Sequence, residues 1–232
     1  MQKRKISVKD KIEVEKPLFR LYNAFSKKYF PKIPFTYYWY LIRLVGDEGE
    51  TLIDFGCGWG DPLEVLQNSK KRYTVGVDIY KKYIDYVKKK GIYSKVICQD
   101  ITKYKSKKKH DIVFCSHVLE HIDKDEAKKM VDYFESITKE KTVLAMPVGE
   151  LPQDSYDNNI YQKHVSVWQP GELRSRGYKV YGFSPKFLYG NQNIIKKIGV
   201  FGFLLFLISY ILEPVYILFP EKCVYMLAVK EK

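Results

Sequence analysis

The chain has 232 residues, of which 46% are hydrophobic and 29% are charged. This length suits one α/β domain with additions, and the composition excludes both a disordered chain and a protein of many membrane spans. The formal net charge of +13 leaves open a solvated basic surface, RNA binding or contact with an anionic membrane. The cysteines form no C-x-x-C pair and the charged N-terminus lacks the apolar segment of a signal peptide, so we expect a reduced, cytoplasmic protein.

Residues 1–48 are expected to form a basic arm followed by two helices. Residues 1–16 are charged throughout, whereas apolar residues recur at helical spacing in 17–30 and again in 35–45. The second helix is dense in aromatic residues, which would either cover one face of a sheet or form a lid over a substrate pocket. Residues 49–232 would then form the main domain.

From residue 51 onward, short apolar strands alternate with amphipathic helices. Asp61 is expected to cap the first of these helices, and Gly91 to end the second. Such an alternation implies right-handed crossovers and a mostly parallel sheet. We predict strands at 51–55, 73–77, 95–98, 111–115 and 142–146, with helices at 62–69, at 80–90 and from 123 onward.

After residue 146 the alternation changes. Residues 147–168 form a long polar loop, and loops of this length in compact domains are typically functional or disordered. A short helix is expected at 170–176, followed by strands at 178–183 and 223–229.

An insertion at 184–221 separates these last two strands, and its central part, 194–219, is very apolar. The uncharged stretch 198–212, ended by Glu213 and Pro214, is shorter than the roughly 20 residues that a membrane-spanning helix needs. Two interpretations stay open: a buried cover or dimer face, and an in-plane contact with an anionic membrane that nearby lysines would support.

The stretch Thr51–Asp61 reads TLIDFGCGWGD and joins a strand to a helix through Gly56, Gly58 and Gly60. Glycines are needed where a tight turn brings the backbone close to a ligand. The spacing G-x-G-x-G differs from the G-x-G-x-x-G of dinucleotide sites, and the carboxylate of Asp61 would repel a pyrophosphate. No GKS or GKT follows the turn, so a P-loop is also disfavoured.

Further carboxylates stand where ligands bind in such folds, at the carboxyl ends of the strands. Asp54 lies in the first strand, Asp78 follows the second and Asp100 follows the third. S-adenosylmethionine (SAM) carries a sulfonium and an ammonium group against one carboxylate and has no phosphate, so acidic surroundings suit it. Asp78 could bind both ribose hydroxyls, a feature that NAD-binding proteins share.

Four segments, in order, resemble the motifs of class I SAM-dependent methyltransferases: LIDFGCGWG, VGVDIY, CQDI and FCSHVLEHI. A later segment, HVSVWQPGELRSRGYKV, resembles the last helix and sixth strand of the small-molecule branch of that family, so the resemblance covers about residues 52–229. It implies a Rossmann-like three-layer α/β sandwich with a seven-stranded, mostly parallel sheet and an antiparallel last strand. It also implies SAM as the cofactor, Asp78 as the ribose ligand and Asp100 beside the adenine amino group.

Candidate site residues follow from these motifs. A general base is needed only if the acceptor is a poorly acidic hydroxyl, because alignment alone supplies most of the rate. The candidate catalytic residues are His117, His121 and His164, although His121 could instead be structural and bonded to the backbone; His110 is expected at the surface. The expected cofactor residues are Asp54, Gly56, Cys57, Gly58, Gly60, Asp78, Ile79, Asp100, Ile101 and Ser116.

The cluster His117, Glu120 and His121 offers side chains that bind metals. It resembles the E-x-x-E-H metal segment of ubiquinone-pathway O-methyltransferases, but His117 replaces the first acid. Many relatives with a VLEH segment use no metal, so we predict none.

The leading hypothesis is a SAM-dependent methyltransferase that acts, preferably at oxygen, on a small molecule, a sugar or a lipid-linked acceptor. Lysine runs at 88–90 and 107–109 raise the alternative of an RNA methyltransferase. Against RNA, the chain shows no appended RNA-binding module and no DPPY-like or NPPY-like segment after the fourth strand. A non-catalytic SAM-binding or membrane-scaffold protein, a homodimer and a peripheral location on the inner membrane face stay open.

Overall fold

The computed structural model describes residues 24–155, 159–189 and 200–232. The expected basic arm and the first half of the helix expected at 17–30 lie outside the described residues. What is described of the N-terminal region is helical at 24–29, and continues through η2 (Phe30–Lys32) into α2 (Tyr37–Val45). The division of the chain at residue 48 stays a prediction.

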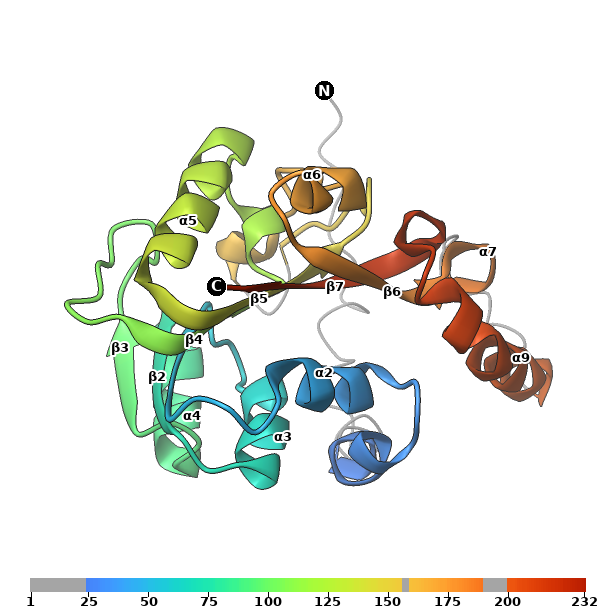
Figure 1. Ribbon diagram of the computed structural model, residues 1–232, viewed down its shortest axis with the longest axis horizontal. Coiled ribbons are helices and arrows are strands. Elements are labelled where there is room, and N and C mark those ends of the chain that lie inside the picture. The colour runs from blue at the N-terminus through green and yellow to red at the C-terminus, as the bar shows by residue number, and fades with distance from the viewer. Residues whose placement is uncertain (1–23, 156–158, 190–199) are drawn as a thin grey trace.

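A seven-stranded sheet in the order β3-β2-β1-β4-β5-β7-β6 forms the centre of the molecule (Figure 1). The pairs among the first five strands are parallel, and β7 is antiparallel to both of its neighbours, β5 and β6. This confirms the predicted fold class. The strands are β1 (Thr51–Phe55), β2 (Tyr73–Asp78), β3 (Lys95–Cys98), β4 (His110–Ser116), β5 (Thr138–Pro147), β6 (Lys179–Pro185) and β7 (Cys223–Glu231).

Helices cover both faces of the sheet (Figure 1). On one face lie α2, α3 (Asp61–Ser69) and α4 (Lys81–Lys90); on the other lie α5 (Lys124–Ile137) and α6 (Pro170–Arg174). Residues alternate between the two faces along a strand. In β1, Leu52 therefore belongs to the core under α2 and α3, whereas Ile53 and Phe55 belong to the core under α5.

The aromatic helix α2 is a cover for the sheet. Its own residues Leu41 and Val45 are fully buried. The ring of Tyr40 lies 5.6 Å, between centroids, from the rings of both Tyr181 and Phe183 on β6. The described contacts of α2 therefore favour the interpretation that it covers one face of the sheet over the interpretation that it forms a lid on a substrate pocket.

Two local predictions are wrong. Asp61 is the first residue of α3 rather than its cap, because Gly60 precedes it at φ +76° and the Asp61 carboxylate is turned to Lys27 Nζ, 2.8 Å away. His110 is buried, at 7% exposure, because β4 begins at this residue. Its Nε2 lies 3.1 Å from the Ser106 hydroxyl, and burial lowers its pKa. The prediction for Gly91 is confirmed: it ends α4 at φ +65°.

The insertion between β6 and β7 is largely helical. It contains α7 (Lys186–Tyr189), α9 (Val200–Tyr216) and η5 (Pro220–Lys222), and α9 projects from the side of the sheet near the end of β6 (Figure 1). The helix includes Pro214 and ends at Tyr216. Within the described ranges, no helix is both long enough and apolar enough to cross a membrane.

Candidate active site

A cavity of about 600 Å³ opens where β1, β2 and β4 end at the carboxyl edge of the sheet. All ten residues predicted to bind the cofactor line it, and so do His117 and His121. His164 is not among the lining residues, although its ring lies 4.9 Å from that of His121. The structure thus brings the predicted residues together, while their contacts with SAM stay a prediction.

The glycine-rich turn forms one wall of this cavity. Gly56 has φ +76°, and a Cβ atom there would lie 2.1 Å from Cγ2 of Val118, so a side chain cannot be accommodated. The backbone N–H groups of Gly56 and Cys57 both donate to the Val77 carbonyl, at 2.8 and 3.1 Å. The turn is therefore bonded to the end of β2, next to Asp78.

Asp78 is held by the turn it faces. Its Oδ2 accepts a hydrogen bond from the Gly58 amide at 2.9 Å, and its Oδ1 accepts one from the Tyr80 amide at 2.8 Å. Burial raises the pKa of this carboxyl, and the backbone hydrogen bonds oppose that rise. These bonds fix the orientation of the carboxylate at the carboxyl end of β2.

Asp54 is the most deeply buried acid of the cavity, at 2% exposure. Its Oδ2 accepts a hydrogen bond from the Tyr93 hydroxyl at 2.6 Å, whereas its Oδ1 is buried without a partner among the described residues. Burial, aided by the nearby charge of Asp78, raises its pKa to about 7 despite the bond from Tyr93. A buried acceptor without a donor is costly unless a ligand supplies one.

Asp100 lies in the turn after β3. Its Oδ1 accepts hydrogen bonds from both the amide and the hydroxyl of Thr102, at 3.0 and 2.8 Å. Its Oδ2 has only a loose contact with Lys103, at 3.8 Å. One oxygen therefore fixes the turn and the other is left to a ligand.

The cavity is acidic. Six carboxylate side chains line it, and none of its described lining residues is a lysine or an arginine: the six are Asp54, Asp61, Asp78, Asp100, Asp123 and Glu126. Asp61 is paired with Lys27, and Asp123 caps α5 by accepting from the amides of Asp125 and Glu126. The remaining acids favour a ligand that carries positive charge.

Several residues that line the cavity were not predicted from the sequence. Trp59 lies within the glycine motif, so its position in the sequence could have identified it as a cavity residue. Its ring centroid lies 4.6 Å from that of Tyr83. Tyr161 and Gln162 come from η4 (Ile160–Gln162) in the long loop after β5, and Asn159 is the N-cap residue of η4. Only the length of this loop indicated a function. Phe114, Val118 and Ile122 supply apolar wall and carry no distinctive pattern.

Of the three candidate catalytic histidines, His117 and His121 line the cavity, and His164 lies beside His121. His117 follows β4 with φ +55°, a conformation uncommon for residues other than glycine, and its amide donates to the Ala145 carbonyl at 2.8 Å. Its side chain is 42% exposed, and its Nδ1 lies 3.3 Å from Oε1 of Glu120. His121 is bonded to the backbone, as its structural interpretation expected: its Nδ1 lies 3.1 Å from the Lys163 carbonyl.

Comparison with known proteins agrees with this geometry. Residues 52–141 match the family model of the methyltransferase domain. No curated protein matches the chain significantly.

Among solved structures, the chain is similar to the magnesium protoporphyrin IX methyltransferase of Synechocystis PCC 6803 with bound SAH, at 13% identity and a TM-score of 0.55, covering 100% of this chain and 90% of that one. It is also similar to a SAM-dependent methyltransferase from Archaeoglobus fulgidus, at 21% identity and a TM-score of 0.53, covering 92% and 94% of the two chains. The plantazolicin methyltransferase in complex with SAH is 15% identical, with a TM-score of 0.52 and coverage of 96% and 93%. At these identities the similarities establish a shared fold.

The matched domain spans the glycine turn, Asp78, Asp100 and β4, which are the elements that build the cavity. Residues 52–141 thus carry the match to a methyltransferase domain, and the whole chain shares the fold of SAM-dependent methyltransferases.

Proposed function

We propose that the protein transfers the methyl group of SAM to the oxygen of a small-molecule acceptor. The acidic cavity beside the glycine turn is the observation that carries this proposal. A site rich in carboxylates, with no lysine or arginine among its described lining residues, suits a sulfonium and an ammonium group and disfavours a phosphate.

The fixed acids have the capacity that SAM requires. A carboxylate oxygen can accept two hydrogen bonds, so both oxygens of Asp78 can accept from ribose hydroxyls while keeping their backbone donors. The less engaged oxygen of Asp100 can accept from the adenine amino group. Asp54, with an oxygen that lacks a donor, can face the positive end of the cofactor.

The acceptor would enter beside η4. Asn159, Tyr161 and Gln162 contribute amide and hydroxyl groups to that wall, and the apolar Val118 and Ile122 lie on it as well. A cavity of about 600 Å³ that must also hold the cofactor fits a small acceptor group. This supports a metabolite, or the reactive end of a larger lipid-linked molecule.

The positions of the lysine runs argue against RNA. Lys88–Lys90 ends α4, and 107–109 immediately precedes β4. α4 starts at the carboxyl end of β2 and runs back toward the amino edge of the parallel strands, so its C-terminal lysines lie at that edge. The run 107–109 lies there too, because β4 begins directly after it, and both runs are therefore opposite the cavity. They are not placed to guide a polynucleotide to the methyl donor.

For methylation at oxygen, we propose His117 as the general base. It lines the cavity, it is partly exposed, and the Glu120 carboxylate lies beside its Nδ1. A carboxylate at Nδ1 favours the tautomer with the proton there, which leaves Nε2 free to accept a proton from an acceptor hydroxyl.

We further propose that the α9 region contacts an anionic membrane, which would suit a lipid-linked acceptor. Ile211, Leu218 and Phe219 are 71%, 68% and 55% exposed, a dense apolar surface for a protein exterior. Lys222 is exposed in η5, and Lys186 lies at the start of α7 beside this surface. Apolar side chains flanked by lysines are typical of helices that lie in the plane of a membrane.

Calorimetric titration of the full chain with SAM tests the cofactor site. Asp78→Asn keeps the size of the side chain but places an amide where an acceptor is needed, so we expect affinity to fall at least about tenfold, or ~1.4 kcal/mol. Asp85→Asn, in the exposed i,i+4 pair of α4, is the matched control and should bind as the unchanged protein does. Equal affinity in both variants would remove Asp78 from the site.

A further inference from the structure

The loop after β5 is bonded onto η3 (Leu119–His121) at the edge of the cavity. The amides of Val165 and Ser166 donate to the Glu120 carbonyl at 2.8 and 3.0 Å, and the Ser166 hydroxyl donates to the Leu119 carbonyl at 2.9 Å. These bonds hold two segments that are distant in the sequence in one fixed arrangement.

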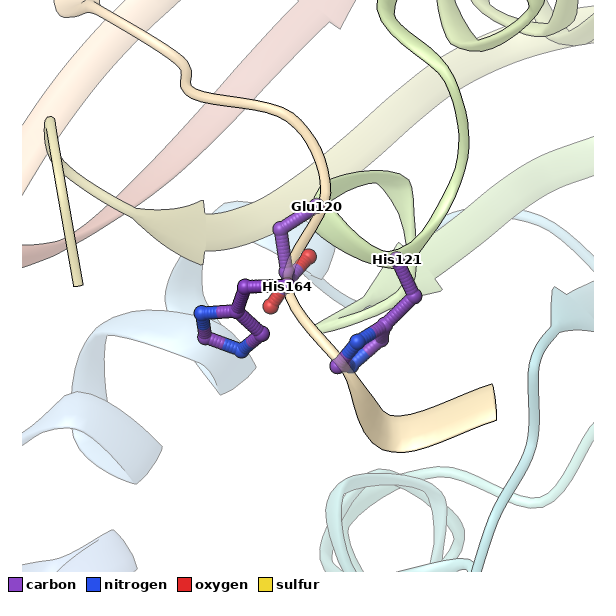
Figure 2. Close-up of side chains that lie close together, drawn as sticks. All are labelled: Glu120, His121 and His164. Carbon is purple, nitrogen blue, oxygen red and sulfur yellow. The ribbon is translucent and has the colours of Figure 1, made fainter. Parts of the chain in front are cut away.

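This arrangement brings three metal-binding side chains together, as Figure 2 shows. One ligand atom from each of Glu120, His121 and His164 lies within 4.8 Å of the others. Ligands at about 2.0 Å from a tetrahedral metal lie about 3.3 Å apart. Small rotations of the side chains would therefore close the group around an ion.

Both imidazoles are oriented by the backbone. Nδ1 of His121 lies 3.1 Å from the Lys163 carbonyl, and Nδ1 of His164 lies 2.5 Å from the Leu151 carbonyl. Because a carbonyl can only accept, each Nδ1 carries the hydrogen and each Nε2 keeps its lone pair. Metal-binding histidines are held in the same way by a bond from the nitrogen that does not bind the ion.

Glu120 supplies the negative charge. It is 2% exposed, and neither of its carboxylate oxygens has a hydrogen-bond partner among the described residues. The Nδ1 of His117 is near Oε1, at 3.3 Å, but the pair does not meet hydrogen-bond geometry. A buried carboxylate without donors is strongly unfavourable unless a cation offsets its charge.

We propose that Glu120, His121 and His164 bind a divalent transition-metal ion. Two imidazole nitrogens and one carboxylate suit Zn²⁺ and its neighbours in the first transition row, rather than Ca²⁺ or Mg²⁺, which prefer oxygen ligands throughout. Three protein ligands leave at least one coordination position open. Because His121 also lines the cavity, the ion would lie at the acceptor side, where it could orient an acceptor oxygen.

The sequence grouped His117 with Glu120 and His121, but no metal was predicted because His117 replaces the first acid of the metal segment that the cluster resembles and many relatives with a VLEH segment use none. His164 is the ligand that the pattern could not supply, because it reaches the cluster only through the folded loop. The binding of the ion is independent of the proposed function, and only its role in orienting the acceptor rests on that proposal.

The test is a titration of the chelator-treated full chain with ZnCl₂ by calorimetry, and with CoCl₂ by visible absorption. We expect one ion per chain with micromolar or tighter affinity, and a Co²⁺ spectrum typical of nitrogen and oxygen ligands. Glu120→Gln and His164→Asn should each weaken Zn²⁺ binding at least tenfold. Val165→Ala, an exposed neighbour in the same loop, should not.

Glu120→Gln also guards against a variant that merely fails to fold, because removing an uncompensated buried charge should keep the metal-free protein at least as stable. Two results would overturn the proposal. One is no uptake of Zn²⁺, and the other is uptake that is unchanged by both ligand substitutions, which would point to another site such as the exposed thiol of Cys98. The titration needs neither SAM nor an acceptor. Its failure would therefore leave the methyltransferase proposal intact, and a chain that binds Zn²⁺ but not SAM would contradict only the latter.

Discussion

The folded protein favours the protonated form of Asp54, because burial raises its pKa to about 7. A carboxyl whose pKa is higher in the folded state than in the unfolded chain stabilises the fold fully at pH values below the unfolded pKa, near 4. This contribution is lost as the pH rises through 7. Asp54→Asn imitates the protonated form, so it should flatten the fall in the free energy of unfolding between pH 5 and pH 8.

Urea unfolding of the ligand-free protein across that range measures the effect, which should reach about 3 kcal/mol, at 1.36 kcal/mol per pH unit between pH 5 and the folded pKa of about 7. Asp125→Asn, a substitution at an exposed carboxylate of α5, should leave the pH profile unchanged. Parallel pH profiles for Asp54→Asn and the unchanged protein would show that Asp54 is already ionised in the folded state.

His117 is the residue on which methylation at oxygen depends. Asparagine tolerates the positive φ of this position, so His117→Asn removes the imidazole without straining the backbone. We expect the rate of methyl transfer to fall about 10²- to 10⁴-fold, the usual contribution of a general base, with SAM affinity unchanged. The loss should shrink as the pH rises and the acceptor ionises unaided.

A rate that is lowered equally at every pH, or a weakened affinity for SAM, would instead assign His117 a structural role. Single-turnover transfer from labelled SAM, measured alongside calorimetry, separates these results.

Among the residues, the acids that line the cavity were predictable from the sequence, and the cavity residues contributed by the loop after β5 were not. Asp54, Asp78 and Asp100 stand at the carboxyl ends of strands, and parallel strands bring such positions together whatever the loops do. Tyr161 and Gln162 lie in a loop whose course depends on bonds to η3, such as that from the Ser166 hydroxyl to the Leu119 carbonyl, and these bonds leave no periodic signal in the sequence.

At the scale of elements, the bounds of the short apolar strands were predicted well, and the polar start of β5 was not. β1 and β3 begin and end as predicted, because apolar runs and turn residues bound them. β5 begins four positions early, at Thr138 instead of Thr142, through a polar segment that resembles a surface loop. Its Thr138 hydroxyl donates to the Phe134 carbonyl at 2.7 Å, so α5 passes directly into the strand.

The helix α9 carries the prediction of membrane contact. Ile211→Glu on α9, combined with Leu218→Glu just after the helix, places charges at two strongly exposed apolar positions. The unchanged protein should sediment with vesicles that contain anionic lipid, and the double variant should partition at least about tenfold less, or ~1.4 kcal/mol. Neutral vesicles should bind more weakly, because the lysines would lose their partners.

Tyr73→Glu, an exposed substitution at the start of β2 on the amino edge of the sheet, is the control and should sediment normally. A protein that stays in the supernatant at every lipid composition would contradict membrane contact. If light scattering then showed a dimer that the double variant dissociates, the apolar side chains would belong to a subunit interface.

At the scale of the whole molecule, topology explains why one edge of the sheet carries the chemistry. The order β3-β2-β1-β4 places the ends of neighbouring parallel strands around one cavity, while both lysine runs fall at the opposite edge. The alternation of strands and helices predicted this arrangement. The antiparallel β7 was expected only from the family resemblance, because its apolar sequence does not reveal its direction.

The most direct test of the central claim is the transfer of label from methyl-labelled SAM into a fractionated cell extract by the purified full chain. We predict label in the small-molecule or lipid fraction, at oxygen by product mass, and its loss in Gly56→Ala, whose added Cβ would collide with Val118. Label that appears in RNA, or no transfer to any fraction by a protein that binds SAM, would contradict the account.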